Sequence, residues 1–156
     1  ISAFSLQAAN ENIAFTVIDN TETNLIGAQR VTIQDRQGYL WFGGDNGLAR
    51  YDGHSAKVFR HNSDQPNSIS SNLIYDIIIG QDGTMWVATS AGLNRYDPEL
   101  ETFTAYTREV DDSQETVSND IRTIMQAQDG RIWLGTAVGI EVFECFCRLV
   151  FVDTVH

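Results

Sequence analysis

The chain has 156 residues, of which 42% are hydrophobic, and its formal net charge at pH 7 is −11. This length and composition suit one ordinary globular domain. So acidic a chain lacks the positive surface that neutralises phosphate groups, which argues against nucleic acid and anionic membrane surfaces as partners. The sequence also has no apolar stretch near the roughly 18 residues that a membrane-spanning helix needs.

Residues 1–13 are expected to lie outside the folded part. Their first ten residues, "ISAFSLQAAN", are similar to the end of a secretory signal peptide, with small residues at Ala8 and Ala9 where a peptidase could cut. That interpretation predicts an exported protein. The alternative is a disordered N-terminus.

From residue 31 onward, one pattern occurs three times. Its anchors are Trp41, Trp86 and Trp133, which are 45 and 47 residues apart. The same offsets link two further sets of residues, namely Gly38, Gly83 and Gly130, and Gly47, Gly92 and Gly139. A period of about 40 to 50 residues with several fixed positions indicates a repeat architecture.

Each repeat predicts four short antiparallel strands. In the middle copy they are residues 73–79, 84–89, 92–97 and 102–107. The Asp82-Gly83 pair between the first two favours a tight hairpin turn. Consecutive hairpins of this kind build a four-stranded sheet.

The second strand of each repeat shows how the sheets pack. In the first copy, Trp41 and Gly43 share one face of the strand, while Leu40 and Phe42 share the other. Because both faces are apolar, the sheet must be covered on both sides, as the blades of a β-propeller are. The small residue two places after each Trp should leave room for a neighbouring indole or backbone; these residues are Gly43, Ala88 and Gly135.

The predicted fold is therefore an all-β propeller fragment with about three four-stranded antiparallel blades. Blade 1 is expected at residues 27–61, blade 2 at 72–107 and blade 3 at 119–153. Residues 14–19 resemble the fourth strand of a blade, and we expect them to form the outer strand that closes the ring of the intact protein. The three tryptophans are assigned to the blade core; sugar-stacking platforms are the alternative role.

The pattern "D-x-x-G-x-L-W-F-G-x-x-x-G-L-x-R-Y-D-G" at residues 35–53 resembles the two-component regulator propeller repeat, and the resemblance extends over residues 31–156. It implies the periplasmic sensor of a membrane-bound bacterial signalling protein, with a histidine kinase or diguanylate cyclase as effector. It also implies an oligosaccharide or other small-molecule ligand, further blades on the same polypeptide, and an arrangement compatible with a homodimer.

The third copy departs from the pattern from Val142 on, where the first two copies have Arg50 and Arg95. Its last stretch, residues 144–156, is either native blade sequence or the aberrant end of a truncated reading frame. Cys145 and Cys147 lie in this stretch, and two thiols alone do not make a zinc site. We interpret them as incidental.

Blade geometry places the linkers between blades on the same face as the turns between second and third strands. The linkers are the longer and more polar segments, so a ligand is expected there. The candidate ligand-binding residues are Asp45, Asn46, Asn72 and Asn119. For each of them a role in holding a turn is the leading interpretation, and ligand binding is the alternative. On the side of the sheets, Arg50 and Arg95 are expected to pair with acidic groups of the next blade.

No nucleophile, metal-ligand or acid–base constellation is recognisable, so we expect no catalytic residue, no metal and no cofactor in this chain. The leading hypothesis is a binding module that senses a solute. Two alternatives remain open, an exported propeller enzyme acting on polysaccharide and a protein-interaction scaffold.

Overall fold

The structure is a computed structural model that describes residues 26–108 and 118–144. It contains eleven β-strands and, within these ranges, no α-helix. Residues 1–13, the expected outer strand at 14–19, and the end of the chain with Cys145 and Cys147 lie outside the described residues.

The strands form three antiparallel sheets in chain order. Blade 1 is a four-stranded sheet made of β1 (Gln29–Gln34), β2 (Leu40–Gly44), β3 (Gly47–Tyr51) and β4 (Ala56–Phe59). Blade 2 is also four-stranded, with β5 (Ile74–Ile79), β6 (Met85–Thr89), β7 (Gly92–Asp97) and β8 (Thr102–Tyr106). Blade 3 has three described strands, β9 (Ile121–Gln126), β10 (Ile132–Thr136) and β11 (Gly139–Phe143).

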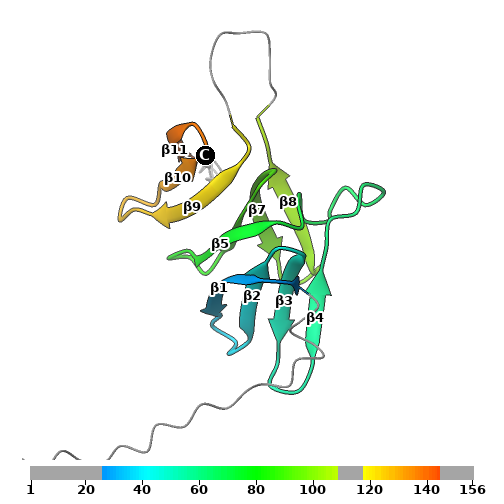
Figure 1. Cartoon of the computed structure of the whole chain (residues 1–156). Coiled ribbons are helices and arrows are strands. Elements are labelled where there is room, and N and C mark those ends of the chain that lie inside the picture. The colour runs from blue at the N-terminus through cyan, green and yellow to red at the C-terminus, as the bar shows by residue number, and fades with distance from the viewer. Residues whose placement is uncertain (1–25, 109–117, 145–156) are drawn as a thin grey trace, which may run out of the picture.

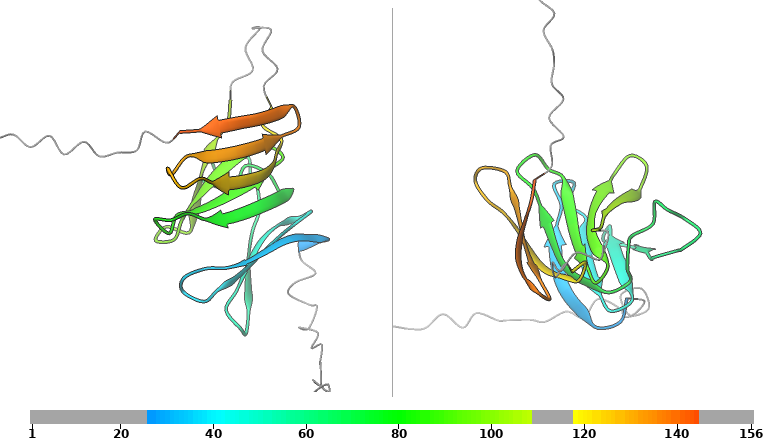
Figure 2. Two further views of the ribbon diagram at one scale, coloured as in Figure 1. Left: turned by 90° about the vertical axis from the view of Figure 1, so that its left-hand side faces the viewer. Right: turned by 90° about the horizontal axis from the view of Figure 1, so that it is seen from above.

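The three sheets stack face to face as propeller blades, which confirms the predicted fold class (Figure 1). Their first strands, β1, β5 and β9, lie next to one another and form the innermost part of the fan (Figure 2). The residues of the fourth strand expected in blade 3 fall outside the described ranges.

The contact between blades 1 and 2 is an aromatic cluster around Trp41, which is 1% exposed. Its ring stacks on Phe59 of its own blade with the centroids 5.7 Å apart. From blade 2, Tyr96 approaches edge-on at 5.0 Å. The indole Nε1 donates a hydrogen bond of 2.7 Å to Asp35 Oδ2, so the polar atom of this buried side chain is paired.

The contact between blades 2 and 3 is also built on a tryptophan, Trp86, whose ring meets Phe143 of blade 3 edge-on at 5.5 Å. Trp86 and Ala88 pack with Ile124, Ile132 and other apolar residues of blade 3 in one buried cluster. The opposite face of β6 carries Met85 and packs against blade 1. Successive residues of β6 thus bury against different neighbours, because side chains of a strand alternate between its two faces.

The room beside Gly43 is filled differently from the sequence-based expectation. A Cβ at this position would lie 2.5 Å from Cγ2 of Ile74 and 2.8 Å from Cγ1 of Val31. The expected indole or backbone neighbour is therefore wrong for Gly43, because the next blade presents a β-branched side chain there. At Gly135 the close atom is Cγ2 of Thr123, which belongs to the same blade.

The Asp-Gly turn of blade 2 has the hydrogen bonds of a tight hairpin. Gly83 N donates to Gly80 O at 2.9 Å, and Asp82 Oδ1 accepts a hydrogen bond of 2.9 Å from Thr84 N. Gly83 has a φ of 89°, a conformation that glycine adopts without the steric cost that a side chain brings.

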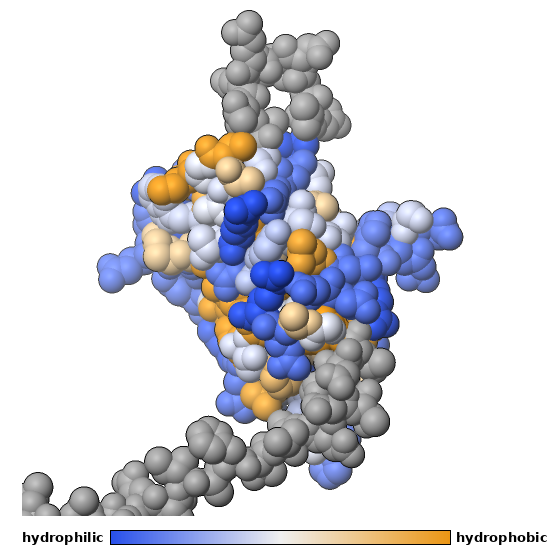
Figure 3. All heavy atoms as spheres, viewed as in Figure 1, coloured by the Kyte–Doolittle hydropathy of each residue, from blue (hydrophilic) through white to orange (hydrophobic). Residues whose placement is uncertain are grey.

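Blade 3 leaves several apolar side chains exposed on the described part of the chain. Val138 is 47% exposed, Ile140 is 79% exposed, and Trp133 is only partly buried. Figure 3 shows hydrophobic residues gathered over the β10–β11 part of the surface. The same repeat position is thus buried in blades 1 and 2 and half-buried in blade 3.

This difference predicts unequal effects of one substitution at two equivalent positions. Trp41→Ala should lower the free energy of unfolding of the 156-residue chain by about 3–5 kcal/mol, because it opens a cavity between two blades. Trp133→Ala should cost clearly less, since its ring is already in contact with solvent. Urea unfolding of the two variants and the parent chain measures both losses, and equal losses would contradict the packing described.

Candidate functional site on the linker face

The linker face consists of the described residues between the blades and the turns between second and third strands. In blade 2, Ser90 N donates a hydrogen bond of 3.1 Å to Leu73 O, and in blade 3, Ala137 N donates one of 3.0 Å to Asp120 O. Each bond ties a turn to the end of the linker that enters its blade. The expectation that linkers and these turns share one face is therefore confirmed.

Asn72 and Asn119 hold the two linkers in the same way. Asn72 Oδ1 accepts a hydrogen bond of 2.7 Å from His61 N, and Asn119 Oδ1 accepts one of 2.8 Å from Arg108 N. Asn119 Nδ2 also donates to Arg108 O at 3.1 Å. Each side chain joins the beginning of its linker to the end, which are 11 residues apart in sequence.

Asp45 and Asn46 form the turn between β2 and β3. Asp45 Oδ1 accepts a hydrogen bond of 2.7 Å from Arg30 Nε, and the carboxylate remains 42% exposed. The backbone of Asn46 donates to Ile26 O at 2.8 Å and accepts from Arg60 Nε at 3.1 Å. The structure thus brings Asp45 close to an arginine of the innermost strand, a pairing that the sequence did not indicate.

A buried polar network under the linker of blade 2 was also missed by sequence reasoning. Asn94 Oδ1 accepts from Ser70 N at 2.9 Å, and Asn94 Nδ2 donates to Ser70 Oγ at 2.8 Å. Thr89 Oγ1 lies 2.9 Å from the same Oγ, and both Thr89 and Asn94 are fully buried. Because the partners are 19 and 24 residues apart, only the pairing of the strands brings them together.

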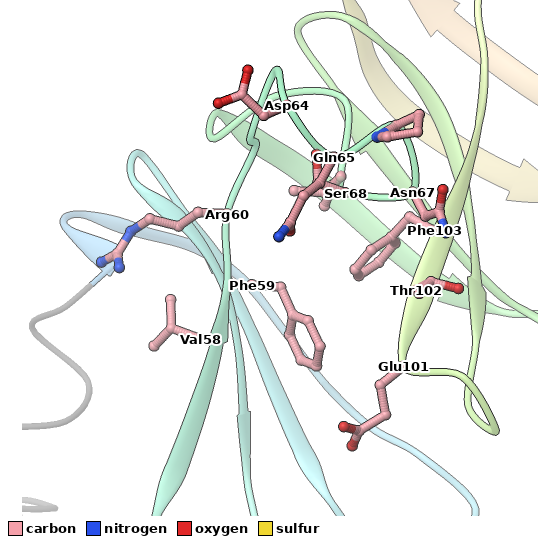
Figure 4. A pocket seen from close by; sticks show the side chains of 12 residues that line it. Val58, Phe59, Arg60, Asp64, Gln65, Asn67, Ser68, Glu101, Thr102 and Phe103 are labelled. Atoms are coloured by element: carbon pink, nitrogen blue, oxygen red, sulfur yellow. The ribbon is translucent and has the colours of Figure 1, made fainter.

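A hollow of about 460 Å³ opens beside the first linker, between the outer strands of blades 1 and 2. Phe59 and Phe103 lie in its floor with their ring centroids 5.5 Å apart (Figure 4). Polar residues of the linker, among them Gln65 and Asn67, line one side, and Glu101 lies at the other end. This combination of an apolar floor and a polar rim suits a small organic group.

A second hollow, of about 790 Å³, lies between the same blades near the Asp-Gly turns. Arg50 crosses it and donates to Glu101 Oε1 at 2.7 Å and to the Tyr96 hydroxyl at 3.2 Å. Its guanidinium carbon also lies 4.9 Å from the centre of the Tyr39 ring, within the range of a cation–π interaction. The expected pairing of Arg50 with an acidic group of the next blade is confirmed.

Arg95, the equivalent residue of blade 2, has no ion pair within residues 26–108 and 118–144. Blade 3 offers Phe143 at the place of Tyr96, so the hydroxyl that binds Arg50 has no counterpart there. The expectation for Arg95 is thus not met among the described residues.

Glu101 is the acidic centre of this second hollow. Hydrogen bonds from Lys57 and then from Arg50 lower the pKa of its carboxyl below the ordinary value of 4.5. For the Tyr96 hydroxyl beside it, burial raises the pKa, and the neighbouring Arg50 offsets part of this rise. The arrangement is an ion-pair network joining two blades.

Within the described ranges no three His, Cys, Asp or Glu side chains come together as a metal site would require. Nor do those residues include a helix of the length and apolarity that crossing a membrane would need.

The family model described as two component regulator propeller matches residues 68–91 and 117–137. The first segment covers the end of the linker into blade 2 together with β5 and β6. The second covers the corresponding linker end, β9 and β10 of blade 3. These two segments are therefore similar to the repeat of the two-component regulator propeller family.

Known proteins with similar sequence or structure agree with this family. Histidine kinase P4 of Formosa agariphila is 39% identical over 72 residues, which are 44% of this chain. The extracellular domain of BT3049 from B. thetaiotaomicron, described as a hybrid two component system, superposes with a TM-score of 0.65 and 29% identity over 74% of this chain. That of BT4673 from the same organism gives 0.63 and 30% over 79%.

This chain spans only a small part of each of those proteins. It corresponds to 5% of the length of Histidine kinase P4 and to 17% of each of the two extracellular domains. The likeness thus concerns a few blades of a much larger assembly.

The hydrogen bonds of Asn72 predict a loss of stability when its side chain is shortened. Asn72→Ala removes the acceptor of the His61 N–H and should lower the free energy of unfolding by about 0.5–1.5 kcal/mol. Asn67→Ala is the matched control, because Asn67 bonds Phe103 through its backbone oxygen only. Chemical denaturation compares the two variants, and an equal loss in both would show that the side-chain bond does not hold the linker.

The lowered pKa of Glu101 predicts a pH dependence of stability. A carboxyl whose pKa is lower in the folded state contributes stability above its ordinary value of 4.5, and loses it as pH falls through the folded value. Glu101→Gln should therefore flatten the fall in unfolding midpoint below pH 4.5. Glu99→Gln is the control, an exposed carboxylate for which the described residues provide no ion pair. Parallel pH profiles of both variants would contradict the role of Glu101.

Proposed function

We propose that this chain is part of the periplasmic ectodomain of a membrane-bound bacterial signalling protein that senses a solute. The observation that carries the proposal is its likeness, at 29–30% identity, to extracellular domains described as hybrid two component systems. The effector of the whole protein would be a histidine kinase or a diguanylate cyclase. Neither would lie in the blades themselves.

The ligand we propose is an oligosaccharide or another small molecule bound on the linker face. Two properties of this face support the choice. Its loops carry polar groups such as Asp45 and Asn46, and hydrogen bonds of Asn72 and of the buried Asn94 hold the supporting linker in place. Polar loops set on a rigid scaffold are a common location for recognition.

Ligand binding would act on the effector by shifting a population. A ligand changes the equilibrium between two arrangements of a receptor only as far as it binds them with different affinity. Further blades of the same polypeptide would cover the exposed apolar residues of blade 3, and a homodimer would provide the second arrangement. The linker face is then the place where the ligand distinguishes the two states.

The test uses the intact protein that contains this chain, in membrane vesicles supplied with labelled ATP and GTP. A panel of neutral and acidic oligosaccharides is added, and protein phosphorylation and cyclic dinucleotide formation are measured. At least one oligosaccharide should change the effector output severalfold. Asp45→Ala combined with Asn72→Ala should shift its half-maximal concentration upward, while Glu99→Gln should leave it unchanged.

Two results would count against the sensor. One is hydrolysis or elimination of an oligosaccharide by the purified protein, which would make it an enzyme. The other is an output that no oligosaccharide changes while a protein partner copurifies in fixed proportion, which would make it a scaffold.

A further inference from the structure

Each innermost strand of the structure contains a β-bulge at the same place. In β1, Gln29 pairs with Gly44 and Val31 pairs with Gly43, so Arg30 between them has no partner. The pairing of β5 likewise passes over Tyr75, and that of β9 passes over Arg122. A bulge turns one side chain out of the regular alternation, and bulges are frequent next to functional sites.

These three residues, which we call the bulge ring, occupy one repeat position. Each of Arg30, Tyr75 and Arg122 lies 11 residues before the tryptophan of its blade. Because β1, β5 and β9 lie side by side, the bulges are neighbours around the inner edge of the fan. Figure 3 shows strongly hydrophilic residues gathered along this part of the surface. Unlike the tryptophans, the bulge residue is not the same in all three blades, being an arginine in blades 1 and 3 and a tyrosine in blade 2.

Arg30 is held in place by contacts that leave its two terminal nitrogens without a hydrogen bond to the described residues. Its Nε donates to Asp45 Oδ1 at 2.7 Å, and its guanidinium carbon lies 5.5 Å from the centre of the Tyr75 ring. The two terminal nitrogens have no hydrogen bond to any residue in the described ranges. The side chain is thus oriented before any ligand arrives, which lowers the entropy cost of binding.

Arg122 is arranged similarly in blade 3, the blade that follows the one with Tyr75. Its Nε and Nη2 donate to the same oxygen, Asp120 Oδ2, at 3.4 and 3.1 Å. Nη1 makes no hydrogen bond within the described part of the chain, and the side chain is 60% exposed. Two guanidinium groups, each with N–H donors to spare, therefore occupy the bulge position in the blades on either side of Tyr75.

From this geometry we propose that the bulge ring is a binding site for an acidic group, a carboxylate or a sulfate, carried by a saccharide. The proposal rests on the function proposed above and names the class of ligand for that face. Guanidinium groups bind such planar or tetrahedral oxyanions through two parallel hydrogen bonds. Asp45 and Asp120 are already paired with the arginine side chains, and the Tyr75 ring offers a surface for the body of a sugar.

The test measures binding to the intact protein by titration calorimetry with three probes of equal size. They are a disaccharide with a hexuronate, a disaccharide with a sulfate ester, and the neutral disaccharide without either group. At least one acidic probe should bind about tenfold or more tightly than the neutral one, and its affinity should fall as salt is raised. The first two probes show whether a carboxylate or a sulfate is preferred.

Variants locate the site. Arg30→Gln and Arg122→Gln should each weaken binding of the acidic probe about 10- to 100-fold and leave the neutral probe unaffected. Arg30→Lys keeps the charge but loses the planar fork, so it should recover only part of the affinity. Arg131→Gln is the matched control, because Arg131 forms an equally exposed pair with Asp129 at the opposite turns.

The inference is overturned if folded protein binds the acidic and neutral probes equally or binds neither. It is also overturned if Arg131→Gln weakens binding as much as the bulge variants do. The bulge-ring proposal and the proposed sensor function can fail independently. An effector output that responds to a neutral sugar and ignores Arg30→Gln would retain the sensor and reject the bulge ring. Binding that depends on the arginines but leaves the effector output unchanged would retain the bulge ring and reject the sensor.

Discussion

The packing of the tryptophan face of one sheet against an isoleucine-rich face of the next is the interaction on which this structure depends. A four-stranded sheet with two apolar faces is not stable alone in water, because each face exposes its hydrophobic side chains. Trp41 and Trp86 bury those faces pairwise, with Ile74 and Ile124 among the residues that receive them. The stacking order of the blades follows directly from this burial.

Because both faces of the sheets are used for stacking, the polar groups of the blades are found at the ends and the inner edge. The linkers carry Asn72 and Asn119 as equivalent braces. The innermost strands carry the bulge ring, where the backbone geometry repeats while blade 2 has a tyrosine and blades 1 and 3 have an arginine. A constant core with variable residues at the ends and the inner edge is the arrangement expected when one scaffold has to support different ligands.

Most of the local structure could be predicted. For the contacts between blades, the type of partner could be predicted but not the residue that provides it. The Asp82-Gly83 turn needs nothing beyond its own residues, so the sequence indicated it correctly. The acidic partner of Arg50 was expected on the next blade without being identified as Glu101, 51 residues away. The neighbour of Gly43 was predicted wrongly, because a small residue indicates close contact and not which atom makes it.

The sequence by itself determined the repeat, the four-stranded unit and the burial of its second strand, because these depend on spacing and on the alternation of side chains along a strand. Tertiary structure alone decided which polar groups meet across blades. Arg30 with Tyr75, and Asn94 with Ser70, are brought together by sheet register and blade stacking. Their separation along the chain carries no local signal, since hydrogen bonds and ring contacts form between whichever groups the packed backbone places within a few ångströms.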